Sequence, residues 1–166
     1  MPKFKYLSHY PESLLLQVEE LLESGKLAGL LQKKYSVGHQ IQSNKALYAY
    51  TMEIKQRYLR KSDPLSKIEY SDKVSALNAL GTHSRVSRVQ GAKLKAKKEI
   101  RIDSRFRSLP EPFLRMLVVH ELAHLKEMDH NKAFYKLCEY MEPDYHQLEL
   151  DLRIYLTWLE HEKKTP

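Results

Sequence analysis

The segment from Phe113 to Leu125, FLRMLVVHELAHL, most constrains what this chain can fold into. Apart from its two histidines, its only charged residues are Arg115 and Glu121, so a helix formed here is apolar around its whole circumference. Such a helix belongs in the interior of a protein rather than on its surface. We therefore predict a buried helix running from Leu109 to about Met128, against which the rest of the chain packs.

Two histidines and a glutamate inside a buried helix need an explanation, because a buried, unpaired carboxylate is costly. His120 and His124 are four residues apart, so their side chains share one helix face and reach one cation. Glu121 lies about 100° further round the helix, where it can take a proton from water bound to that cation. The alternative is a pair of core histidines satisfied by hydrogen bonds. The HExxH spacing favours metal ligands at His120 and His124, with Glu121 as catalytic base.

A third ligand has to come from outside this segment, and we predict that it is His130. This histidine follows His124 by six residues and lies between Asp129 and Asn131, which favour turns over helix interiors. A turn there brings the imidazole back to the metal. If His130 is not the ligand, a carboxylate from the following helices takes its place, as in the His₂Glu zinc enzymes. The candidates for that role are Glu139, Glu142 and Glu149.

Composition narrows the class of protein. Apolar residues make up 42% of the chain, charged residues 30%, and there are only 5 glycines, as in a compact, helix-rich protein. The single cysteine, Cys138, excludes an intrachain disulfide and the Cys-based zinc sites. The start of the chain shows no signal-peptide pattern, and no apolar run approaches the roughly 20 residues of a membrane helix. We expect a cytoplasmic protein without a membrane partner.

The net charge of +7 is unevenly distributed. Residues 26–108 contain 19 Lys or Arg against 6 Asp or Glu, whereas residues 109–166 contain 7 against 11. A basic middle part permits binding of a polyanion such as nucleic acid. The alternative is a solvated surface without a partner.

The remaining pattern predicts an α+β fold with a small, mostly antiparallel sheet packed against the HExxH helix. We expect residues 1–62 to form an N-terminal helical extension and residues 63–166 a catalytic region. The expected helices are 11–34, broken at Gly25 or Gly29, then 44–61, 131–141 and 145–160. The expected strands are 67–70, 84–89 and 98–103.

The sequence VVHELAHLKEMDHNKAFY, which contains His120, His124, His130 and Phe134, resembles the signature of the YgjP-like metallopeptidase family, relatives of the SprT-like and WLM zincins. The upstream LGTHSR and IRIDSRFRSLPEPFLRMLVVHE add to the resemblance, which covers about residues 65–160. It implies a minimal zincin-like fold, three histidine ligands to one Zn²⁺ ion and a glutamate base. Members are described as metal-dependent hydrolases or metallopeptidases, and some carry a nucleotide pyrophosphatase activity in their name.

The leading hypothesis is a zinc-dependent metallopeptidase that hydrolyses a peptide or protein substrate with water activated by Glu121. The first alternative is a metal-dependent hydrolase of nucleotides or phosphorylated small molecules. The second is a nucleic-acid-associated protein, with DNA-linked protease activity or with a structural metal that takes His146 as fourth ligand. For the oxyanion-stabilising group the sequence offers three candidates, which are Tyr135, Tyr145 and His146.

Overall fold

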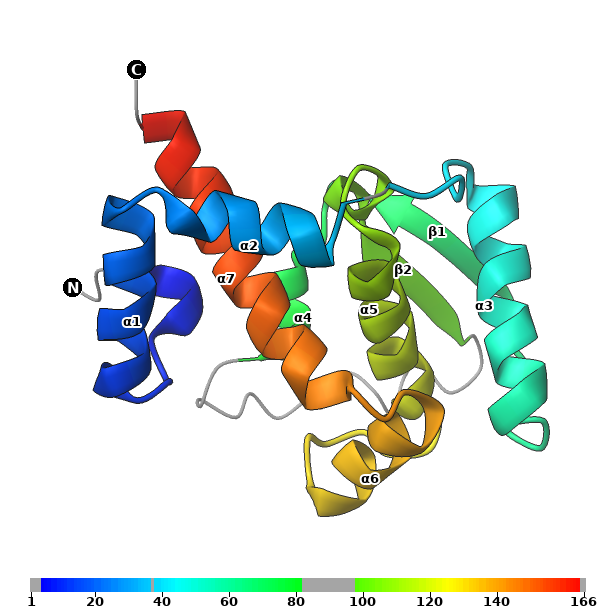
Figure 1. The fold of residues 1–166 in the computed structure, drawn as a ribbon. Coiled ribbons are helices and arrows are strands. Elements are labelled where there is room, and N and C mark those ends of the chain that lie inside the picture. The colour runs from blue at the N-terminus through cyan, green and yellow to red at the C-terminus, as the bar shows by residue number, and fades with distance from the viewer. Residues whose placement is uncertain (1–3, 37, 82–97, 165–166) are drawn as a thin grey trace. The chain divides into compact units, whose positions relative to one another are not determined.

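The computed structural model describes residues 4–36, 38–81 and 98–164. In chain order, the elements are η1 (Lys5–Leu7), α1 (Glu12–Glu23), α2 (Lys26–Lys34), α3 (Asn44–Tyr58), β1 (Lys67–Ser71), α4 (Ala76–Leu80), β2 (Glu99–Asp103), η3 (Ser104–Arg107), α5 (Glu111–Ala123), α6 (Lys132–Met141) and α7 (Tyr145–Lys164) (Figure 1). Among the helices described here, none combines the length and the apolar composition that a membrane span requires.

The predicted mostly antiparallel sheet is wrong. The described part of the chain is mainly helical, and its sheet is a parallel pair in the order β1-β2. Residues 72–98 connect the two strands, and a connection of this length allows the crossover that parallel strands need. Alternating apolar residues determine which face of a strand is buried, but they carry no information about the direction of its neighbour. The strand predicted at residues 84–89 lies outside the described residues.

The register of the strand pair separates a buried face from a charged one. Ile68 lies opposite Ile100 and Tyr70 opposite Ile102, and all four side chains are buried. On the other face, Glu69 forms ion pairs with Lys67 at 3.4 Å and with Arg101 at 3.7 Å. The buried face of β2 thus follows from the alternation of Ile100 and Ile102 with exposed Glu99 and Arg101, and the alternation ends at Asp103, which is buried.

The chain forms two compact units, one of residues 38–145 and one that joins Met1–Val37 to His146–Pro166. In the first unit α5 is the central helix, because α3, α4, α6 and β2 all pack against it (Figure 1). Its side chains are buried over almost the whole circumference, as its uniform apolar sequence predicts. Those with at most 1% exposure are Phe113, Leu114, Met116, Leu117, Val118, Val119, His120, Leu122 and Ala123.

The second unit contains η1, α1, α2 and all of α7 after Tyr145. Gly25 separates α1 from α2 in a left-handed conformation with φ 77°, which confirms the break predicted there. Arg153 of α7 is 1% exposed and donates to the carbonyl oxygen of Tyr6 at 3.0 Å and to Glu149 at 3.2 Å. These bonds satisfy a guanidinium group that would otherwise be costly to bury.

Side-chain caps explain where α3 and α6 begin. The Ser43 hydroxyl accepts from the Ala46 N–H at the start of α3, and the Asn131 carboxamide accepts from the Phe134 N–H at the start of α6. The largest difference from the predicted helix boundaries is at α5, which ends at Ala123 rather than near Met128. The short helix α4 was not predicted at all, since its five residues are too few to show a helical period.

Candidate metal centre

The three histidines that the sequence selected lie together in the structure. His120 and His124 come from the C-terminal end of α5, and His130 comes from the turn between α5 and α6. The Nε2 atom of His124 lies 3.2 Å from that of His120 and 3.1 Å from that of His130. One ligand atom from each ring lies within 4.8 Å of the others. Within the described residues, this is the group of side chains able to hold a metal ion.

These spacings match those around a tetrahedral metal. With Zn–N bonds of about 2.0–2.1 Å, two nitrogen ligands of a tetrahedral ion lie about 3.3–3.4 Å apart. The observed separations of 3.1 and 3.2 Å are slightly shorter than this spacing, so a small outward movement of the rings would let one ion bind between them. His120 is fully buried, whereas His124 and His130 are half-buried, so a fourth position can face water or substrate.

Hydrogen bonds to the Nδ1 atoms of His120 and His124 decide which ring nitrogen of each histidine carries the proton. Nδ1 of His124 is 2.9 Å from the carbonyl oxygen of Glu127. A carbonyl oxygen can only accept a hydrogen bond, so this Nδ1 carries the hydrogen. In the neutral ring, Nε2 then carries a lone pair that can bind a cation. Nδ1 of His120 lies 2.7 Å from the hydroxyl group of the buried Tyr145, which can accept in the same way. Lone pairs that converge at this distance repel unless a cation lies between them. The donor set thus fits a divalent metal ion.

Phe134 forms the floor of the site. Its ring centroid lies 4.9 Å from that of His120, 4.5 Å from that of His124 and 4.9 Å from that of His130. The ring is fully buried and holds all three imidazoles in place by edge and tilted contacts. The aromatic residue reaches this position because Asn131 starts α6 directly after His130.

Glu121 is half-buried on α5, one position after His120. Helical geometry places it about 100° round the axis from His120 and on the side from which its carboxylate can approach the same ion. Its assignment as the catalytic base stays a prediction.

The carboxylates considered as replacements for His130 are placed elsewhere. Glu142 forms an ion pair with Arg115 at 3.1 Å, and Glu149 pairs with Arg153 at 3.2 Å within the second unit. Glu139 is exposed on α6. Because the described ligand group consists of histidines, the arrangement favours His130 over these three residues.

Two residues around the site have positions that sequence reasoning did not give. Tyr145 was considered as an oxyanion-stabilising group, but its hydroxyl lies at the Nδ1 side of His120, away from the three Nε2 atoms. Gly81, the residue after α4, lies against the His130 ring. Neither contact has a signal in sequence spacing, because each partner is more than 20 positions away from its histidine.

The chain is similar to known proteins over the region that contains the three histidines. The family model described as YgjP-like, metallopeptidase domain, matches residues 83–155. A protein of Escherichia coli (strain K12), named UTP pyrophosphatase, is 55% identical over 160 residues, which cover 96% of this chain and 96% of that protein. No solved structure matches the chain.

The matching family model, the hydrolase relative and the three-histidine group together define a metal-dependent hydrolase. The chain belongs to the YgjP-like family, as its sequence signature predicted.

Proposed function

We propose that this protein is a zinc-dependent pyrophosphatase that hydrolyses UTP to UMP and pyrophosphate. The observation that carries the proposal is the 55% identity to a UTP pyrophosphatase, which extends over 96% of both chains and is therefore not confined to one shared motif. The sequence alone ranked peptide hydrolysis first and nucleotide hydrolysis second. The near-full-length relative reverses that order.

The residues of the site can supply what phosphoanhydride hydrolysis requires. A bound divalent ion would provide a Lewis acid that polarises a phosphoryl oxygen and lowers the pKa of water. Glu121 accepts the proton of the attacking water and returns it to solvent or to the leaving group. The water oxygen bonds to phosphorus, the P–O bond between the α and β phosphates breaks, and pyrophosphate leaves. His120, His124 and His130 hold the ion.

Zinc is the ion that this donor set favours. Imidazole nitrogens suit zinc, whereas magnesium prefers carboxylate and water oxygens. This preference argues against a nucleotide substrate, because phosphoryl transfer commonly uses magnesium. A zinc site and a nucleotide substrate are compatible if magnesium enters with the triphosphate of the substrate, since magnesium is commonly bound through substrate phosphates. The charge of residues 26–108 also favours a polyanionic substrate.

A metallopeptidase is the second candidate function. It is favoured by the HExxH helix with a third histidine, which can activate water toward a peptide carbonyl as well as toward phosphorus. The name of the matching family model also describes a metallopeptidase domain. Nucleic-acid binding through residues 26–108 stays a prediction of the sequence, to be tested by the salt dependence of DNA and RNA affinity.

One experiment separates the two enzymatic functions. The purified protein, supplied with Zn²⁺ and with or without Mg²⁺, is given UTP and, in parallel, a mixed peptide library. We expect UMP and pyrophosphate to form and the peptides to remain intact. The His130→Ala variant should lose this activity, whereas the matched control His161→Ala, near the C-terminal end of α7, should keep it. Cleaved peptides together with intact UTP would establish the peptidase instead.

A further inference from the structure

Gly81 has a backbone conformation that glycine alone adopts readily. It follows the last residue of α4 with φ 84° and ψ 163°. An L-amino acid is strained there, because its Cβ clashes with the neighbouring main chain. Among the described residues, the only other one with a positive φ is also a glycine, Gly25.

The absent side chain at Gly81 also leaves space that the His130 ring fills. A Cβ atom built on Gly81 would lie 3.1 Å from Nδ1 and 3.2 Å from Cε1 of His130. Carbon atoms in van der Waals contact are normally about 3.5–4.0 Å apart. Any residue larger than glycine would therefore have to push the imidazole ring away by a few tenths of an ångström.

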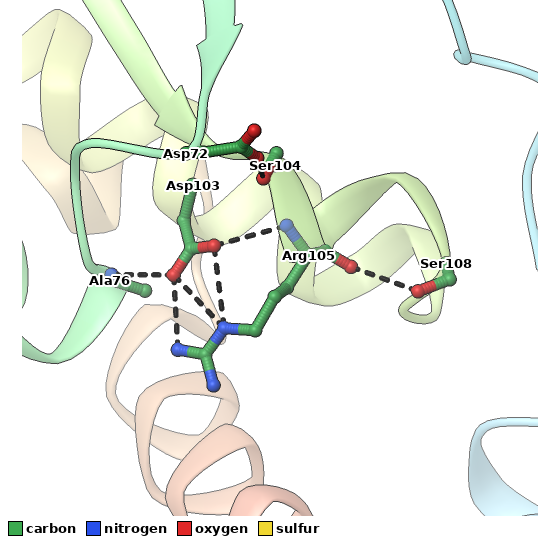
Figure 2. Close-up of polar contacts among 6 residues, drawn as sticks. All are labelled: Asp72, Ala76, Asp103, Ser104, Arg105 and Ser108. Atoms are coloured by element: carbon green, nitrogen blue, oxygen red, sulfur yellow. Dashed lines mark hydrogen bonds and ion pairs between the residues drawn. The ribbon is translucent and has the colours of Figure 1, made fainter.

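The position of Gly81 is fixed by the rest of the unit. Ala76 opens α4, and its N–H donates at 2.9 Å to the carboxylate of Asp103, which is 4% exposed at the end of β2. The same carboxylate accepts from the guanidinium group of Arg105 at 3.0 Å and from the Arg105 N–H at 3.0 Å (Figure 2). Asp72 and Ser104 are hydrogen-bonded beside it. Helix α4 also packs on α5, so Gly81 cannot easily retreat from the histidine.

The His130 ring is confined on its other sides too. Its Nε2 lies 3.1 Å from the Nε2 of His124, and its centroid lies 4.9 Å from that of the buried Phe134. Metal–ligand distances in a well-formed site lie within about 0.2 Å of their usual values. A shift of the His130 ring by a few tenths of an ångström would therefore disturb the distance from its Nε2 atom to a bound ion.

We propose that Gly81 is a positioning residue of the metal centre, which sets the place of His130 by packing its bare backbone against the imidazole ring. The proposal rests on the three-histidine site and not on the identity of the substrate. Its test therefore measures metal binding, and it can fail or succeed independently of UTP hydrolysis.

The experiment compares Gly81→Ala with Gly25→Ala in the full chain. Gly25 is the control for a positive φ, since its φ is 77°, its ψ is 4° and no atom lies within 4 Å of a built Cβ. The double-mutant cycle below separates the strain of the Gly81 backbone itself, with its ψ of 163°, from the contact with His130. Zn²⁺ affinity is measured by competition with a chromophoric chelator, and folding is monitored by circular dichroism. We expect Gly81→Ala to bind Zn²⁺ about 10-fold or more weakly, the range seen when the groups that orient metal ligands are altered. Gly25→Ala should keep the affinity of the wild type.

A double-mutant cycle with His130→Ala keeps the proposal testable if Gly81→Ala folds poorly. Removing the imidazole removes the atoms that the new Cβ would meet. Gly81→Ala should therefore cost less thermal stability in the His130→Ala background than in the wild type. Equal costs in both backgrounds, or unchanged Zn²⁺ affinity in a folded Gly81→Ala variant, would overturn the proposal.

Discussion

The hydroxyl group of Tyr145 lies 2.7 Å from Nδ1 of His120, and both side chains are fully buried. The tyrosine opens α7, twenty-five positions after the histidine, so the start of the last helix orients the first residue of the HExxH motif. An Nδ1–H that donates to this hydroxyl puts the lone pair of the neutral ring on Nε2, the atom that would bind a cation. The same bond fixes the ring against rotation, which is the usual role of groups behind metal-binding histidines.

Replacing Tyr145 with phenylalanine should weaken metal binding. The ring would remain to fill the core, but the partner of His120 Nδ1 would be lost. We expect Zn²⁺ affinity to fall by about 10–100-fold in a chelator competition assay, as for other partners of metal-binding histidines. Tyr140→Phe is the control, because Tyr140 is 61% exposed on α6. Equal affinity in Tyr145→Phe and the wild type would show that this hydrogen bond does not support the site.

Replacing Glu121 with glutamine should remove the base and leave the metal in place. We expect turnover of UTP to fall by about 10²–10⁴-fold, the usual contribution of a positioned general base. Elemental analysis should still find about one zinc per chain, because the proposed ligands are unchanged. Glu53→Gln, an exposed change on α3, serves as the control. A variant that loses its zinc would instead make Glu121 a ligand.

Metal removal should destabilise the folded protein. At a free Zn²⁺ concentration of 1,000 times Kd, the ion stabilises the native state by about 4 kcal/mol, which corresponds to roughly 8–16 °C in the unfolding midpoint. Differential scanning calorimetry with Zn²⁺ and with a chelator measures the shift. It should shrink as the pH falls, since protons compete with the ion for the imidazole nitrogens. His130→Ala should show a much smaller shift, and a full shift in that variant would move the third ligand elsewhere.

Replacing Arg153 with methionine should destabilise the unit that contains α7. The change leaves Glu149 buried without its partner, and breaking such a pair costs about 3–5 kcal/mol. Burial already raises the pKa of Glu149, although Arg153 lowers it in part. A raised pKa means that the folded state binds the proton of Glu149 more tightly than the unfolded state does. The stability that protonation of Glu149 contributes is therefore lost as the pH rises.

Arg153→Met should accordingly be less damaging near pH 4 than near pH 7, where Glu149 has to remain charged. Urea unfolding at the two pH values measures the difference. The double variant Arg153→Met with Glu149→Leu should recover much of the stability at pH 7, because it buries no charge. A single variant as destabilised at pH 4 as at pH 7 would show that lost packing of Arg153, rather than an unpaired Glu149, causes the effect.

How much of the site the sequence could predict depends on how local each relationship is. His120, Glu121 and His124 share one helix, so their relative positions follow from 3.6 residues per turn. The position of His130 was predictable because Asn131 is a favoured helix N-cap and starts a new helix directly after it. The parallel direction of β1 and β2 was not predictable in this way, since the pattern of Ile100 and Ile102 is the same in either direction.

The sequence by itself determined that α5 is buried and that His130, six positions after His124, is the candidate third ligand. These are consequences of helical periodicity and capping, which act over a few residues. The tertiary structure alone decided that Tyr145 lies behind His120 and that Gly81 lies against His130. Both contacts join segments distant in the chain, and such contacts are set by the packing of the whole unit rather than by any local preference.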